Sequence, residues 1–161
     1  MSFVTIYHVK RLKKEGLTMY VSDLENILGG EDVLDHGIKS QFDLIELSKR
    51  GLSKTSLEHL AEFTGISVNK LVKFLPISLR SVQRLDRDER FGSAVSESIL
   101  RIAEVYARGM EVFEDRELLL AWMSAPSPAL NLQSPLDLLD TLYGAQVVLD
   151  ELTRIEHGVA A

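Results

Sequence analysis

The sequence predicts an all-α protein, with a helix-turn-helix bundle followed by a second helical domain. Serines recur where helices should begin and glycines where they should end, and apolar residues repeat at helical spacing from residue 93 onward. Alternating apolar and polar residues, which are typical of strands, occur only at 3–9. The chain therefore divides into an N-terminal segment 1–39, expected to be partly ordered, a helix-turn-helix domain 40–92 and a helical domain 93–161.

The N-terminal half is predicted to form a series of short helices. Ser22 and Glu25 have the spacing of a capping box, and Gly29 and Gly30 should end that first helix. Further helices are expected over 40–51, 53–64, 67–75 and 78–87. The first of these four should bury an apolar stripe of Phe42, Leu44, Ile45 and Leu47.

The C-terminal half begins with one long amphipathic helix over 93–113, whose apolar stripe includes Val95, Ile99, Ile102, Ala103, Tyr106, Met110 and Phe113. A shorter helix over 115–124 is followed by a loop, 126–135, that holds three of the four prolines. Ser134 and Pro135 are typical of a helix start, so a brief helix should follow. A final helix buries Ala145, Val148, Leu149, Leu152 and Ile155 and should end near residues 157–158.

Charge is distributed unevenly. The net charge is −6, and residues 100–161 carry four bases against ten acids. Residues 70–90 carry six bases against three acids and form the one basic stretch with helical spacing. Because an acidic protein repels phosphates overall, any contact with DNA should be local to this stretch and made by a homodimer.

Catalysis has little support in the sequence. The chain has no cysteine, its four histidines do not share a helix face, and no HExxH, GxSxG, P-loop or GxGxxG pattern is present. We therefore expect no catalytic residue, no metal site and no cofactor. No apolar run approaches the roughly 20 residues of a membrane span, and lysines and arginines interrupt residues 10–14, so we expect a cytoplasmic protein without a signal peptide.

The most informative segment, 71–85, has the pattern of a helix-turn-helix. Ile77 should pack after the turn, Ser78 should cap the second helix, and Val82 and Leu85 should face inward. Arginine and glutamine side chains on the outer face could bind guanine, adenine or phosphate. The side chains expected to face outward are Leu79, Arg80, Ser81, Gln83 and Arg84, and the predicted DNA contacts are Ser78, Arg80, Ser81, Gln83 and Arg84.

Two alternatives remain open for this segment. The same pattern fits two core helices with a solvated basic face. A competing helix-turn-helix frame also exists over 60–71, with Asn69, Lys70 and Lys73 facing outward. The later frame is preferred because arginine provides more bidentate donors than lysine.

The chain also carries longer motifs. Residues 77–84 match an Ile-Ser-x-Arg-Thr-x-Gln-Arg pattern, with Ser81 in place of threonine. A second block comprises Glu97-Ser98, Leu100-Arg101, Glu111-Val112-Phe113, Trp122, 126–130, 134–139, Gly144-Ala145 and 154–158. In these residues the chain resembles the Xre antitoxins of bacterial RES–Xre toxin–antitoxin pairs, a group that includes the MbcA and ParS proteins. It departs at Ile99, where arginine is usual, and at Asn131-Leu132, where Gly-Gly is usual.

The resemblance implies an antitoxin that neutralises a cognate RES-domain toxin, which is an enzyme that consumes NAD. The antitoxin is also expected to bind operator DNA, to repress its own promoter, and to form a homodimer or higher assembly in complex with the toxin. The resemblance also implies that residues 93–161 are a toxin-binding domain whose C-terminal end approaches the toxin's active site. The predicted toxin contacts are Trp122, Pro128, Leu130, Arg154, Glu156, His157, Gly158 and Ala161. For Trp122, taken by itself, simple burial in the core over the long helix is the alternative, because a lone tryptophan is usually buried. The alternative function is a stand-alone transcription regulator with a C-terminal dimerisation or sensing domain.

Overall fold

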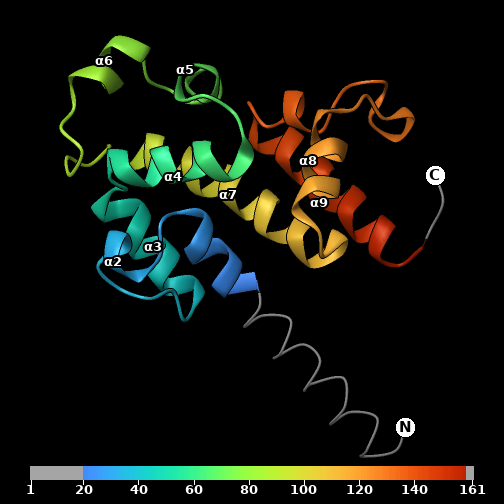
Figure 1. Cartoon of the computed structure of the whole chain (residues 1–161), viewed down its shortest axis with the longest axis horizontal. Helices are drawn as coiled ribbons and strands as arrows, with labels where there is room; N and C mark the ends of the chain where they lie inside the picture. The colour runs from blue at the N-terminus through green and yellow to red at the C-terminus, as the bar shows by residue number, and fades with distance from the viewer. Residues whose placement is uncertain (1–19, 159–161) are drawn as a thin grey trace, which may run out of the picture.

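The computed structural model describes residues 20–158, and over that range all regular secondary structure is helical, as predicted (Figure 1). The possible strand at 3–9 lies outside the described residues. A helical segment at 20–27 comes first. It is followed by α2 (Glu31–Leu34), α3 (Gln41–Arg50), α4 (Lys54–Thr64), α5 (Val68–Leu71), the 3₁₀ turn η1 (Val72–Phe74), α6 (Leu79–Arg84), α7 (Ser93–Phe113), α8 (Arg116–Ser124), the 3₁₀ turns η2 (Pro128–Leu130) and η3 (Leu136–Leu138), and α9 (Leu142–Glu156).

Most predicted helix starts are confirmed by their caps. The Ser53 hydroxyl accepts a hydrogen bond from the Ser56 N–H at 3.2 Å, and the Asp115 carboxylate accepts one from the Leu118 N–H at 2.9 Å. At the start of α3, the Asp43 carboxylate accepts from the Ser40 N–H at 2.7 Å. Each bond satisfies a backbone donor that has no partner within its helix, which is why these residue types mark helix starts.

The predicted capping box at Ser22 is wrong. The helix has already begun at residue 20, so Ser22 is an exposed position inside it. Glu25 does not reach back to cap the helix, because its carboxylate accepts a hydrogen bond from the backbone N–H of Ile38. Glu25 therefore ties the first helix to the segment that leads into α3.

The apolar stripe predicted for α3 is only half correct. Leu47 is buried and Leu44 packs partly against the core, but Phe42 is 80% exposed and Ile45 is also exposed. Helix α3 packs against α7. Leu44 and Leu47 belong to the core or pack against it, whereas Phe42 and Ile45 do not.

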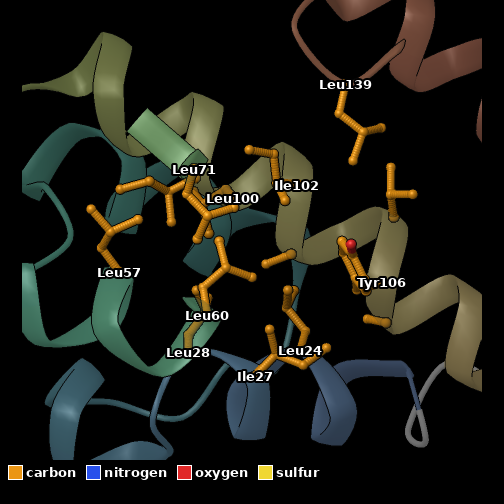
Figure 2. Close-up of a cluster of buried hydrophobic side chains, with 14 of the residues drawn as sticks. Leu24, Ile27, Leu28, Leu57, Leu60, Leu71, Leu100, Ile102, Tyr106 and Leu139 are labelled. Carbon is orange, nitrogen blue, oxygen red and sulfur yellow. The ribbon is translucent and has the colours of Figure 1, made fainter. Parts of the chain in front are cut away.

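The long helix α7 organises the core, since α3, α4, α8 and α9 all pack against it. One continuous cluster of buried side chains extends from Leu24 to Leu152. Figure 2 shows leucines and isoleucines of the N-terminal segment, α4 and α7 in one cluster, with the buried Tyr106 at one side of it. The described part of segment 1–39 is thus built into the same core as both later domains.

One polar pair lies at the edge of this core. The Tyr20 hydroxyl donates to the Glu104 carboxylate at 3.2 Å, beside a cavity of about 180 Å³ that is also lined by Leu24, Ile38 and Leu44. Burial raises the pKa of Glu104, and the hydrogen bond from Tyr20 offsets part of that rise. Because the pKa of a carboxyl group is higher in the folded state than in the unfolded state here, ionisation of Glu104 opposes folding.

Replacing Glu104 with glutamine should therefore raise the free energy of unfolding at pH 7 by about 1 kcal/mol, because glutamine carries no charge and still accepts from Tyr20. This gain in the free energy of unfolding should shrink toward about pH 4, where the Glu104 carboxyl group becomes protonated in both the folded and the unfolded chain. Urea unfolding at the two pH values measures both effects. Glu97→Gln, at an exposed position of the same helix, is the matched control and should change little. A loss of stability at pH 7 in Glu104→Gln would contradict this interpretation.

Candidate functional site

Helix α6 has the packing predicted for a recognition helix. The Ser78 hydroxyl accepts from the Ser81 N–H at 3.1 Å, and Val82 is buried beneath the helix. Ile77 and Leu85 pack partly against the core, as predicted. The exposed side chains are Arg80, Ser81, Gln83 and Arg84. Leu79 was expected to face outward, but it is half-buried against the core because α6 has only six residues and needs an apolar anchor at its start.

The basic side chains of residues 70–90 differ in whether they form ion pairs. Residues 66–85 contain four bases and no acid. Within residues 20–158, no ion pair involves Arg80 or Arg84, whereas Arg87 pairs with Glu58 at 3.1 Å and Arg90 pairs with Asp35. Two of the six bases predicted to form the basic stretch are therefore paired with acids of the same chain. We call Arg80, Gln83 and Arg84 the α6 face.

The two helix-turn-helix frames differ in their second helix. In the earlier frame, α4 ends at Gly65 with φ 68°, but α5 has only four residues and continues as a 3₁₀ turn. In the later frame, residues 75–78 connect η1 to α6, and the exposed Pro76 is accommodated in a tight turn in which the Ile77 N–H donates to the Leu75 carbonyl at 2.8 Å. The later frame gives the longer and better capped second helix.

The proline-rich segment forms an ordered loop, as its composition predicts. The Ser127 carbonyl accepts from the N–H groups of Leu130 and Leu132, and the Ser127 N–H donates to Gln133 at 3.0 Å. Asn131 and Leu132, which stand where the resemblance expects two glycines, both have positive φ, 56° and 61°. The loop therefore keeps a backbone that suits glycine while carrying two larger residues.

Two predicted toxin contacts lie in this loop and differ in their exposure. Pro128 is exposed at the start of η2. Leu130 is only 4% exposed, so its side chain holds the loop from inside, and its contact with the toxin stays a prediction. Trp122, at the end of α8, is half-buried with its ring 5.5 Å from that of Phe113. Most of Trp122 thus closes the junction between α7 and α8.

The polar residues at the end of α9 are held by the fold. The Arg108 guanidinium binds the carboxylate of Glu156 through both terminal nitrogens, one of them at 3.1 Å, and that of Glu111 at 2.9 Å. The hydrogen bonds from Arg108 lower the pKa of Glu156, whereas burial raises the pKa of Glu111. Glu156 therefore connects the last turn of α9 to α7, a role that its prediction as a toxin contact did not include.

The remaining tail residues are exposed. Arg154 pairs with Glu151 at 3.0 Å, and the His157 ring lies 2.7 Å from the Thr153 carbonyl. Gly158 has φ 65°, a left-handed conformation that ends the helix. Ala161 lies outside the described residues.

Sequence reasoning missed the outer face of α9. Leu142, Tyr143 and Val147 are exposed there, although the opposite face packs on α7. The signal was available in the sequence, because these residues lie off the stripe formed by Ala145 and Val148. When a surface helix carries apolar side chains on both faces, its outer face is expected to pack against another protein surface.

Other kinds of site receive no support from the part of the chain that the structure describes. There, no three His, Asp or Glu side chains gather in a way that could hold a metal ion. No helix between residues 20 and 158 is both long and apolar enough to cross a membrane.

Comparison with protein families finds two adjoining matches. Residues 43–104 match the model of the antitoxin Xre-like helix-turn-helix domain. Residues 108–158 match that of the antitoxin Xre/MbcA/ParS C-terminal toxin-binding domain. The first match contains the α6 face, and the second contains the proline-rich loop and α9.

Individual relatives agree with these matches. The chain is 32% identical over 118 residues to an antitoxin Xre of Yersinia enterocolitica, covering 72% of this chain and 80% of that protein. It is 26% identical over 113 residues to an antitoxin Xre of Photorhabdus laumondii, covering 69% and 76% respectively. A protein of a Sphingobium strain named Prs ADP-ribosylating antitoxin is 26% identical over 134 residues, covering 76% of this chain and 83% of its own length.

Proposed function

The chain belongs to the Xre family of antitoxins, with a helix-turn-helix domain and an Xre/MbcA/ParS toxin-binding domain, and from that premise we propose that its partner is a RES-domain toxin that consumes NAD. The observation that carries this proposal is the toxin-binding match over 108–158, which covers an ordered loop and a helix with an exposed apolar face. The Sphingobium relative adds support through the chemistry in its name, because ADP-ribosylation takes its ADP-ribose from NAD.

DNA binding is the second part of the proposal. The α6 face carries two arginines and a glutamine on a capped helix whose opposite side is buried, and no acid occurs between residues 66 and 85. This arrangement suits insertion into the major groove, where arginine binds guanine and glutamine binds adenine. The expected result is repression of the antitoxin's own promoter by a homodimer, since helix-turn-helix proteins read two half-sites.

Co-purification tests the proposed partner. The full chain is expressed together with the candidate RES-domain toxin, with an affinity tag on the toxin alone. We expect the two to elute together as one complex by size-exclusion chromatography with light scattering. If the chain remains separate from the toxin but still binds its promoter, it is a stand-alone transcription regulator and the toxin proposal is wrong.

A further inference from the structure

The outer face of α9 is an apolar surface that the fold leaves uncovered. Leu142 is 67% exposed, Tyr143 86% and Val147 46%. At 100° per residue these three positions fall within one side of the helix, which also carries the hydrogen-bonded pair Gln146 and Asp150. The opposite side is buried, and α9 is anchored at its start by the Thr141 hydroxyl, which accepts from the Gly144 N–H at 3.0 Å. The apolar face is therefore presented on a rigid helix.

Leu132 is a fourth exposed apolar side chain, in the loop whose η2 turn packs against α9. It is 73% exposed and has φ 61°. A leucine in the left-handed region costs on the order of 1–3 kcal/mol, and burial of a side chain this exposed cannot compensate that cost within the chain. Strained residues of this kind concentrate where a ligand or partner is bound. We call Leu132, Leu142, Tyr143 and Val147 the α9 surface.

The charge around the α9 surface defines the kind of partner that fits it. No lysine or arginine occurs between Arg116 and Arg154, whereas that stretch contains five acids. Three of them, Asp137, Asp140 and Asp150, are exposed on η3, just before α9 and on α9 itself. A complementary surface would be apolar at its centre and basic at its rim.

We propose that the α9 surface is where the antitoxin docks its toxin, on an apolar patch of the toxin that is bordered by lysines and arginines. The inference rests on the proposed function and adds to it the residues that provide the affinity. The toxin is the favoured occupant because the matched toxin-binding domain holds most of the exposed apolar surface. Within residues 20–158, seven large apolar side chains are strongly exposed, and five of them, Leu118, Leu132, Leu142, Tyr143 and Val147, lie at 108–158.

Alanine variants of the full chain test the surface. Tyr143→Ala and Leu142→Ala should each weaken toxin binding, Tyr143→Ala by about thirtyfold or more, as expected for an aromatic residue at the centre of an interface. Phe42→Ala is the matched control, because Phe42 is an equally exposed aromatic residue on α3, outside the toxin-binding match. Calorimetric titration against the purified toxin gives the dissociation constants, and circular dichroism checks that each variant is folded.

Leu132→Gly separates binding from folding. Glycine relieves the left-handed strain, so the melting temperature should stay the same or rise, while the loss of the side chain should weaken toxin binding by about tenfold. Unchanged affinity in Tyr143→Ala and Leu132→Gly, with normal binding by the unaltered chain, would overturn the inference and leave the proposed function intact. A change in the antitoxin's own oligomeric state, without a change in toxin affinity, would instead assign the surface to contact between two copies. No binding by the unaltered chain would contradict both proposals.

Discussion

Replacing Arg80 and Arg84 together with alanine is expected to weaken binding to promoter DNA by about thirtyfold or more. Each arginine that contacts a base edge contributes on the order of 1–3 kcal/mol, and two such losses add to at least about 2 kcal/mol per protomer. The two guanidinium groups are exposed and form no ion pair within the described residues, so their loss leaves no partner unsatisfied. Fluorescence anisotropy with a labelled promoter fragment measures the change.

The salt dependence of promoter binding shows whether Arg80 and Arg84 contact DNA phosphates directly. Each lost phosphate contact should reduce the slope of log K against log salt by about 1. Arg154→Ala, which removes an exposed charge from α9, is the control and should leave DNA affinity nearly unchanged. If the double variant binds DNA as tightly as the unaltered chain, the α6 face is only a solvated basic surface, or the earlier frame with Lys70 and Lys73 makes the contact.

Deleting residues 157–161 is expected to reduce inhibition of the toxin by about a hundredfold or more, while folding and DNA binding persist. A cleft that holds NAD carries hydrogen-bonding groups for the dinucleotide's phosphates, so a hydrogen-bonding tail side chain such as that of His157 can occupy it. Two charge-assisted hydrogen bonds of roughly 1.5–3 kcal/mol each account for a loss of that size. The DNA contacts should be unaffected, because Figure 1 shows α6 and the last turn of α9 toward opposite ends of the molecule.

The residue at which the deletion begins decides whether the last turn of α9 stays intact. A deletion from Arg154 onward would also remove Glu156, the partner of Arg108, and expose the last turn of α9. A deletion from His157 keeps that ion pair, so thermal unfolding should remain close to that of the full chain. Full inhibition by the folded truncated protein would show that the tail does not enter the cleft, and that docking on the α9 surface alone holds the toxin inactive.

The sequence predicts the helices well because their signals are local. A capping residue such as Ser78 lies three positions from the N–H that it caps, and the stripe of α7 repeats with the period of the helix itself. The errors occur where distant segments decide the outcome. Phe42 is exposed because α7 covers only part of α3, and Glu25 binds Ile38, 13 residues away, so neither contact follows from local spacing.

The two surfaces were predictable to different degrees. The α6 face follows from one continuous motif, and the structure exposes Arg80, Gln83 and Arg84 as that motif requires. Which residues are exposed in the toxin-binding match depends instead on contacts between α7, the proline-rich loop and α9. Consequently the sequence did not distinguish the buried Leu130 from the exposed Leu132, two positions later, and it did not reveal that Glu156 binds Arg108, 48 residues earlier.

The most direct test of the proposed antitoxin activity is the rate at which the purified RES-domain toxin consumes NAD as the full chain is added. We expect the rate to fall in proportion to the added antitoxin and to approach zero once the toxin is saturated, as tight binding requires. An undiminished rate of NAD consumption at about a tenfold molar excess of folded antitoxin, well above the toxin concentration, would contradict neutralisation of this toxin.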